Sequence, residues 1–245
     1  MSDTSPDSDL RAEVAAIRHE LDMLKDQQAI RALQHTYGYL MEKGLYQEVV
    51  DLFADDAEMT FFGGVFRGKE SIKRVYLGRI RKNFTKGRNG PVRGLLCDVL
   101  QMQDVITVAD DRKTAKGRFR ALLMGGTHAQ VPEAPKLPYQ QWWEAGVYEN
   151  EYMREDGVWK YKALGYQLTW MAEFDKGWAH APDMSAYGPG VLYPENPNGP
   201  DAIAQTRYPP WPETWLLPFH YPHPVTGEPM VPEGDWPGNT TQVHK

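Results

Sequence analysis

The fold is decided by one stretch of the chain, QWWEAGVYENEYMREDGVWKYKALGYQLTWM at residues 141–171. Apolar and aromatic residues alternate with polar ones through residues 141–154 and again through 158–171, as they do in half-buried β-strands. Between the two runs, Glu155-Asp156-Gly157 is a turn signal. The stretch therefore predicts a long antiparallel hairpin.

Upstream of this hairpin, two more long strands are predicted at residues 93–108 and 114–124, and a short hairpin at 57–67 that turns at Gly63-Gly64. Four further segments have apolar residues spaced by three or four, which predicts helices at 10–26, 30–41, 46–54 and 71–84. Because the helices are segregated from four long antiparallel strands, the order predicts an α+β fold rather than a parallel βαβ sheet.

The bulk composition excludes several classes of function. The 245 residues carry a net charge of −6 and neither half is strongly basic, so the charge pattern of a nucleic-acid-binding protein is missing. No stretch approaches the roughly 18 apolar residues of a membrane span, and the polar, acidic first ten residues do not resemble a signal peptide. We therefore expect a cytoplasmic protein with neither a nucleic-acid nor a membrane partner. Cys97 is the only cysteine, so an internal disulfide is impossible.

The C-terminal part of the chain differs from the rest. Residues 176–245 hold 14 of the 19 prolines, a content that usually indicates disorder. They also carry aromatic residues that are costly to leave in water: Tyr193, Tyr208, Trp211, Trp215, Phe219, Tyr221 and Trp236. We expect an ordered, extended strap that packs on its own domain or on a neighbouring subunit.

Three motifs before residue 172 resemble a known family. Residues 30–59 are IRALQHTYGYLMEKGLYQEVVDLFADDAEM, residues 68–72 are GKESI, and residues 146–164 are GVYENEYMREDGVWKYKAL. Their order and spacing resemble the SnoaL-like branch of the nuclear-transport-factor-like superfamily. The resemblance implies a cystatin-like, cone-shaped α+β barrel in which a curved antiparallel sheet wraps around N-terminal helices and leaves a pocket at its wide end.

We expect an N-terminal helix at residues 1–25, the SnoaL-like α+β barrel domain at 26–175 and the strap at 176–245. The fold alone does not fix a reaction, because it hosts dehydratases, isomerases, cyclases, hydrolases and binding proteins.

The resemblance points to two residues of the second predicted helix. Tyr37 matches the family's pocket-facing tyrosine. Glu42 matches an acid that, in the scytalone dehydratase relatives, works with tyrosines and histidines around a bound water. Glu42 also stands near the predicted helix end, where a solvated carboxylate is equally expected.

A buried charged pair is the second candidate feature. Arg79 lies on the apolar stripe of the helix at 71–84, and a buried guanidinium needs an anionic or carbonyl partner. Asp98 interrupts an apolar strand in which the dehydratases carry a catalytic histidine that this chain lacks. We expect Arg79 and Asp98 to meet in the cavity; the alternatives are a structural ion pair for Arg79 and a solvent-facing edge position for Asp98.

The hairpin at 141–171 supplies further candidates. On one face of its first strand, alternation gathers Trp142, Glu144, Gly146, Tyr148 and Asn150. The resemblance directs Tyr148 into the pocket, as a hydrogen-bond donor, a general acid or a pocket wall. Trp142, Phe61 and Met124 are expected to line aromatic subsites, and His128 either reaches the pocket mouth or is structural.

No metal or other cofactor is expected. His220 and His223 lack a third ligand at a usual spacing. The chain contains no phosphate loop, dinucleotide fingerprint or Ser-containing nucleophile elbow.

A narrower resemblance points to a reaction. The aromatic C-terminal extension and the strand LLCDVLQMQ at 95–103 resemble sphingomonad diarylpropane lyases, which act on lignin-derived aromatic dimers without a cofactor and release formaldehyde. In such a lyase Arg79 would stabilise a phenolate, Asp98 or Glu42 would act as acid or base, and Tyr37 and Tyr148 would hold the leaving hydroxyl.

Two alternatives stay open: a dehydratase or double-bond isomerase acting on a ring compound such as a steroid or polyketide, and a non-catalytic binding module. The expected partner is a small aromatic substrate. A homo-oligomer, either dimer or trimer, is also expected, because open-faced sheets of this fold commonly pair.

Overall fold

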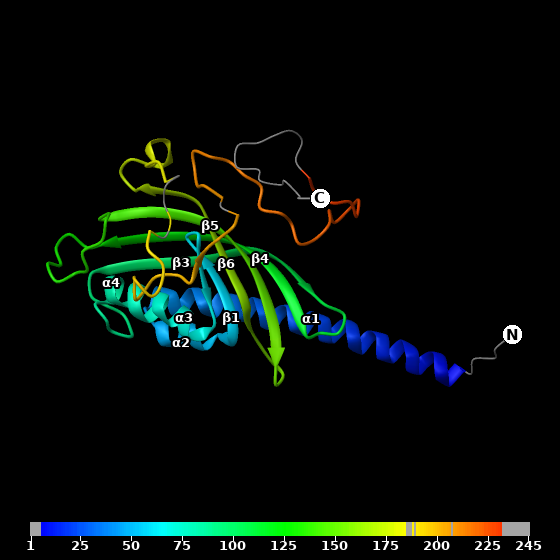
Figure 1. The fold of residues 1–245 in the computed structure, drawn as a ribbon. Helices are drawn as coiled ribbons and strands as arrows, with labels where there is room; N and C mark the ends of the chain where they lie inside the picture. Colours follow the sequence, from blue (N-terminus) through cyan, green and yellow to red (C-terminus); the bar gives the residue numbers. More distant parts are fainter. Residues whose placement is uncertain (1–5, 185–187, 189, 207, 232–245) are drawn as a thin grey trace.

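The computed structural model describes residues 6–184, 188, 190–206 and 208–231 of the chain. It confirms the predicted α+β cone. Helices pack against one face of a single curved sheet, and a long C-terminal segment crosses the other face (Figure 1). Within the described residues, every helix is too short or too polar to pass through a bilayer.

The helices precede the four long strands, as predicted. They are α1 (Pro6–Glu42), α2 (Tyr46–Asp51), α3 (Lys69–Lys73) and α4 (Arg81–Thr85), with a π-helical segment η1 (Arg74–Ile80) between α3 and α4 and a short 3-10 turn η2 (Trp178–His180) after the sheet. The helices predicted at 10–26 and 30–41 are one continuous helix of 37 residues. The residues between them, Gln27-Gln28-Ala29, are good helix formers and do not interrupt it.

The sheet has seven strands. They are β1 (Phe53–Phe61), β2 (Gly64–Arg67), β3 (Leu95–Val108), β4 (Thr114–Thr127), β5 (Gln141–Glu155), β6 (Val158–Glu173) and β7 (Ala202–Ile203). Their order is β3-β4-β5-β6-β1-β2-β7, and the long strands β3 to β6 are antiparallel neighbours as predicted. β1 runs parallel to β6.

Two local predictions were wrong by a few residues. The helix predicted at 46–54 ends at Asp51, and Phe53 begins β1 instead, because it pairs with Tyr161 of β6 and packs on its ring at 5.0 Å. This tertiary contact outweighs the local helical spacing. The hairpin turn is Phe62-Gly63, where both residues have positive φ, as a two-residue hairpin turn requires.

Close packing of α1 on β3 identifies the inner face of the sheet. A Cβ on Gly38 of α1 would lie 2.8 Å from the carbonyl oxygen of Val99 and 2.9 Å from the Gln101 side chain. The side chain of Gln101 also accepts a hydrogen bond from Gln34 of α1. Because side chains alternate along a strand, the odd-numbered residues Cys97, Val99 and Gln101 face the helices.

The C-terminal strap is anchored on the chain's own domain beside η1. Asp201 accepts hydrogen bonds from the side chains of Ser71 and Arg74, each at 2.5 Å. Gly78 of η1 leaves room for Asn198, since a Cβ there would lie 2.1 Å from the Asn198 side-chain oxygen.

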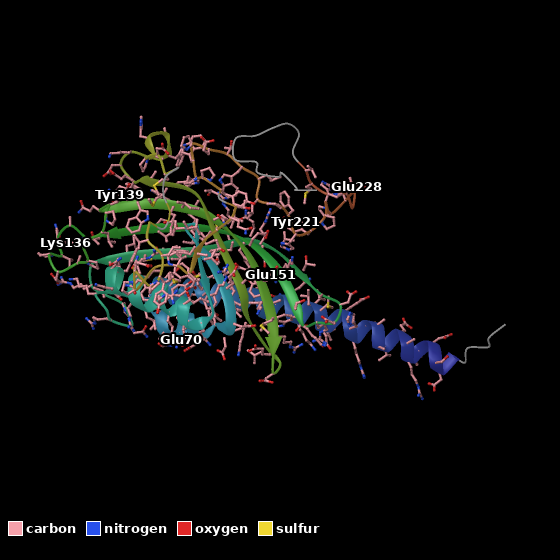
Figure 2. All side chains as sticks on the ribbon, in the orientation of Figure 1. Glu70, Lys136, Tyr139, Glu151, Tyr221 and Glu228 are labelled. Carbon is pink, nitrogen blue, oxygen red and sulfur yellow. The ribbon has the colours of Figure 1, made fainter. Side chains whose placement is uncertain are left out.

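Farther along, the strap crosses the outer face of the sheet. The backbone N–H of Trp211 donates to the carbonyl of Thr169 on β6, and Arg118 of β4 donates to the carbonyl of Leu217. Figure 2 shows Tyr221 of this segment on the side of the sheet away from the helices. The described part of the strap therefore contacts the sheet of its own chain.

Candidate functional site

Glu144 is a carboxylate buried on the inner face of β5. Glu144 is 8 % exposed. Its neighbours on the adjacent strands are Leu123 of β4 and Met171 of β6. Tyr166 donates a hydrogen bond to its Oε1 across 2.7 Å. Burial raises the pKa of the Glu144 carboxyl above its ordinary value, and the hydrogen bonds from Tyr166 and Trp142 offset only part of this rise.

A cluster of buried tyrosines lies next to Glu144. The hydroxyl of Tyr37 is 3.1 Å from that of Tyr76 and is also hydrogen-bonded to Tyr148. The ring of Tyr148 packs on Tyr166 with 4.8 Å between centroids. Burial raises the pKa values of all four hydroxyls, so they remain protonated near neutral pH. The cluster therefore offers several hydrogen-bond donors beside one carboxylate.

Gly146 makes the contact between Tyr166 and Glu144 possible. A Cβ at this position would lie 2.3 Å from the ring of Tyr166, so the ring can cross β5 only over a glycine. Glycine within a strand often marks such a close approach. Gly125 has the same role for Trp142, whose indole would lie 2.2 Å from a Cβ there.

A cavity of about 160 Å³ lies beside Tyr166, where β1 ends. Tyr166, Leu168 and Phe62 line one side, and strap residues that include Tyr208 and Pro210 close the other. A cavity of about 150 Å³ is known to hold a benzene molecule. The space next to Tyr166 thus has room for one aromatic ring, although Glu144, Tyr37 and Tyr148 are not among its lining residues.

Several of the predicted site residues surround this cluster. Tyr37 and Tyr148 belong to it, and Trp142 is buried on the same face of β5. The ring of Phe61 lies 5.9 Å from that of Tyr166, and the guanidinium of Arg79 lies 5.7 Å from the Phe61 ring. Arg79 stands on η1, and π-helical turns occur frequently at functional sites.

Asp98 takes the outward-facing position that was its alternative, and the expected position of Met124 was wrong. Asp98 is half-exposed between the buried residues Cys97 and Val99, so it points to the opposite face of β3 from the tyrosine cluster. Met124 is the cross-strand partner of Asp98 and lies on that same outer face. The expected meeting of Arg79 and Asp98 inside the cone is therefore wrong as well.

Among the described residues, no hydrogen bond or ion pair joins His128 or Glu42 to Glu144. His128 is exposed in the loop after β4, where its Nδ1 accepts a hydrogen bond from the backbone N–H of Gln130, and it does not line the cavity beside Tyr166. Glu42 is half-buried at the last turn of α1. Burial raises the pKa of the Cys97 thiol to about 12, with smaller contributions from the charges of Glu144, Asp98 and Glu42.

The two histidines of the strap have contacts other than metal ligation. His220 lies 3.2 Å from the Glu149 carboxylate, and His223 accepts hydrogen bonds from the backbone N–H groups of Val225 and Thr226. In the part of the chain that the structure describes, no group of three His, Cys, Asp or Glu side chains is arranged to hold a metal.

Sequence reasoning missed Glu144 and Tyr166 as site residues. The signal for Glu144 was present, since strand alternation placed it on the face of Trp142 and Tyr148. Tyr166 is the cross-strand partner of Tyr148, and the pairing register that brings them together is not written in either strand alone.

Comparison with known proteins agrees with this architecture. The family model described as SnoaL-like domain matches residues 22–164, which is more than half of the chain. No curated protein matches the chain significantly.

Solved structures of similar fold include LinA, which is 22 % identical with a TM-score of 0.51, the match covering 64 % of this chain and 94 % of that one. They also include hexachlorocyclohexane dehydrochlorinase LinA-type3 from Novosphingobium barchaimii LL02, at 22 % identity and a TM-score of 0.49, covering 62 % and 92 % of the two chains. A third is an NTF2-like protein with a cystatin-like fold from Novosphingobium aromaticivorans, at 18 % identity and a TM-score of 0.45, covering 68 % and 92 %. These likenesses show the fold alone, whereas the family model shows membership: the chain belongs to the SnoaL-like domain family.

Proposed function

We propose that this chain is a cofactor-independent lyase that eliminates a leaving group from an aromatic or ring-shaped compound by acid–base catalysis. The observation that carries the proposal is the buried Glu144 carboxylate, held by Tyr166 and bordered by further tyrosine hydroxyls. A carboxyl whose pKa is raised by burial exchanges a proton more readily near neutral pH than an ordinary one does.

Each side chain near Glu144 has a role in this proposal. Glu144 takes up and returns the proton, and Tyr166 keeps its carboxylate in place. Tyr148 and Tyr37 donate hydrogen bonds to the leaving hydroxyl. Arg79, beside the Phe61 ring, stabilises a phenolate through its positive charge.

The finer proposal concerns a lignin-derived diarylpropane 1,3-diol with a para-hydroxyl group, and it rests on the resemblance noted in the sequence. The phenol loses its proton and the benzylic hydroxyl, protonated by an acid, leaves as water, which gives a quinone methide. A base then removes the proton of the terminal hydroxyl, and the carbon–carbon bond breaks. Its electron pair forms the double bond of the stilbene and pushes the electrons of the quinone methide back into the ring as a phenolate, so that formaldehyde and a stilbene are the products. Glu144 replaces Asp98 and Glu42 as the proposed acid and base, because it is the carboxylate that is buried among the tyrosines.

The cavity bears on the size of the substrate. Its volume of about 160 Å³ suits one ring, but Glu144, Tyr37 and Tyr148 do not line it, so the proposal requires side chains or strap residues such as Tyr208 and Pro210 to move before a substrate reaches Glu144.

The test is a product assay on the full chain. A para-hydroxylated diaryl 1,3-diol is incubated with the protein without added metal or cofactor, and formaldehyde and the absorbance of the stilbene are measured. The finer proposal expects both products in equal amounts. Loss of water without formaldehyde, or turnover only of a ring substrate such as a steroid enone, would support the dehydratase or isomerase alternative. Thermal stabilisation by these compounds without any turnover would support a binding protein and overturn the enzyme proposal.

A further inference from the structure

An apolar stripe runs along the part of α1 that projects beyond the sheet. Its members are Leu10, Val14, Ile17, Leu21 and Leu24, which are 39 to 60 % exposed. Figures 1 and 2 show this part of α1 extending past the sheet, with its side chains reaching into open space. The spacing of four, three, four and three residues is the heptad spacing of a coiled-coil seam.

The charges beside the stripe follow the same heptad. With Val14 and Leu21 at a and Leu10, Ile17 and Leu24 at d, the e positions are Arg11, Arg18 and Lys25 and the g positions are Glu13 and Glu20. All described e residues of these two heptads are therefore basic and both g residues are acidic. Charged e and g residues form the interhelical ion pairs that set partner choice and orientation in coiled coils.

This charge pattern is complementary to itself in one orientation only. In a parallel pair, a g residue faces the e residue five positions later in the other helix, so Glu13 faces Arg18 and Glu20 faces Lys25. In an antiparallel pair, e faces e and g faces g, and like charges would meet. Opposite charges across the seam favour the parallel pair, and like charges disfavour the antiparallel one.

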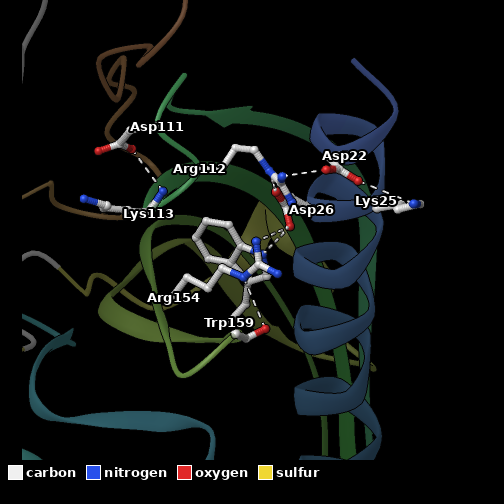
Figure 3. Close-up of polar contacts among 9 residues, drawn as sticks. Asp22, Lys25, Asp26, Asp111, Arg112, Lys113, Arg154 and Trp159 are labelled. Carbon is white, nitrogen blue, oxygen red and sulfur yellow. Dashed lines mark hydrogen bonds and ion pairs between the residues drawn. The ribbon is translucent and has the colours of Figure 1, made fainter. Parts of the chain in front are cut away.

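The domain holds α1 by its other side. Asp26 is buried and accepts hydrogen bonds from Arg112 at 2.6 Å and from the indole of Trp159 at 3.0 Å, and Asp22 pairs with Arg112 at 2.8 Å (Figure 3). Asp22 and Asp26 occupy b and f positions, so the seam is turned away from the domain. Because the rest of α1 is already fixed on the sheet, the projecting turns need no new helix nucleus.

We propose that residues 10–24 of α1 form a parallel coiled coil with the same residues of a second copy of this chain. The seam is apolar, its flanks are self-complementary, and no partner of other sequence is needed to match them. The coiled coil would be about 22 Å long, at about 1.5 Å per residue. It joins two domains at the same end and leaves Glu144 and the tyrosine cluster of each copy untouched.

The first experiment measures the mass of the full chain by light scattering after gel filtration and by sedimentation. The native protein is expected to have at least twice the mass of one chain. The double variant Ile17→Glu/Leu21→Glu is expected to shift to the mass of one chain. The matched control, Ala12→Glu/Ala16→Glu, places the same charges on the outer c and f positions and is expected to keep the native mass. A monomeric native protein, or a seam variant of native mass, would overturn the proposal.

The second experiment tests orientation through charge. The variants Glu13→Lys/Glu20→Lys and Arg18→Glu/Lys25→Glu are each expected to be monomeric, because each gives flanks of one sign. An equimolar mixture of the two variants is expected to regain the native mass, because the basic flanks of one variant then face the acidic flanks of the other. Separately, Leu10→Cys is expected to form a disulfide between copies on mild oxidation, because d faces d in a parallel pair. If the mixture stays monomeric, or if Leu10→Cys does not cross-link in a protein of native mass, the parallel coiled coil is wrong. Circular dichroism confirms that each variant is folded.

Discussion

The hydroxyl of Tyr166 donates a hydrogen bond to Oε1 of Glu144 across 2.7 Å, from β6 to the neighbouring strand β5. Burial raises the pKa values of both groups. The tyrosine therefore keeps its proton, and the carboxyl is the group of the pair that titrates closer to neutral pH. This relationship makes Glu144 the proton-transfer group of the proposed enzyme and leads to three of the predictions below.

Glu144→Gln is expected to lower kcat by about 10²–10⁴-fold, the usual contribution of a general acid or base. The amide keeps the shape of the side chain but cannot accept or return a proton. The matched control is Glu151→Gln on the same strand, whose side chain is exposed. Steady-state rates with the diaryl diol check the prediction, and near-native turnover of Glu144→Gln would remove Glu144 from the mechanism.

Tyr166→Phe is expected to move the inflection of the rate against pH to a higher pH. The hydrogen bond from Tyr166 lowers the pKa of Glu144, so its loss lets burial raise that pKa further. Tyr148→Phe is the control, because Tyr148 is hydrogen-bonded to Tyr37 and not to Glu144. A profile of kcat/KM from pH 4 to 9 measures the inflection, and an equal shift in both variants would contradict the assignment.

The effect of Glu144→Gln on stability is expected to depend on pH. The folded protein raises the pKa of Glu144 above the ordinary value of 4.5, so the ionised carboxyl is less favourable in the folded than in the unfolded chain. The native protein thus loses stability as the pH rises from 4.5 through the pKa of Glu144 in the folded state. The Gln variant has no carboxyl at this position, so its stability does not fall for this reason. The free energy of unfolding of the variant, relative to the native protein, should increase by about 1.4 kcal/mol for each pH unit between the two pKa values. Urea unfolding at pH 4 and pH 8 measures it, and a decrease over this range would contradict the raised pKa.

Arg79→Gln and Asp98→Asn are expected to have different effects on turnover. Arg79 lies over the ring of Phe61, and that ring in turn packs beside Tyr166. Loss of a charge that stabilises a phenolate is expected to lower kcat by about 10²-fold. Asp98 lies on the outer face of β3, so its amide variant should stay within about 2-fold of the native rate, since it touches no proposed catalytic group. Steady-state rates with the phenolic diol compare the two variants. A greater loss of kcat for Asp98→Asn than for Arg79→Gln would contradict the placement of the active site on the inner face of the sheet.

Gln34→Leu is expected to lower the free energy of unfolding by about 3 kcal/mol or more. The side-chain oxygen of Gln34 accepts hydrogen bonds from Asn150 at 2.8 Å, Tyr152 at 2.9 Å and Tyr161 at 2.7 Å. Leucine would leave these buried donors without this acceptor, at a cost of about 1–3 kcal/mol for each that stays unsatisfied. Urea unfolding measures the loss, with the exposed Gln28→Leu of the same helix as the control. An equal effect of both changes would show that the network adds nothing to stability.

The long strands could be predicted from the sequence because alternation is a property of each strand by itself. The pattern in residues 141–171 fixed the hairpin of β5 and β6, and it already placed Glu144 beside Tyr148 on one face. The same holds for the stripe from Leu10 to Leu24, whose spacing is visible in the chain, although its exposure is not.

The sequence did not reveal which face of β3 looks inward. Asp98 stands among apolar neighbours on both sides, and only the packing of Gly38 against Val99 shows that Cys97 and Val99, not Asp98, face the helix. Phe53 likewise has helical spacing in the sequence but belongs to β1, because its ring packs on Tyr161 from a strand more than a hundred residues away.

By itself the sequence determined the α+β class, the four long strands and the family, because these depend on periodicity and on short motifs. The tertiary structure decided which carboxylate is buried among the tyrosines, which residues only share the outer face, and where the strap lies. The physical reason is that burial and pKa depend on the register between strands and on contacts across the fold, and those contacts join residues that are distant in the chain.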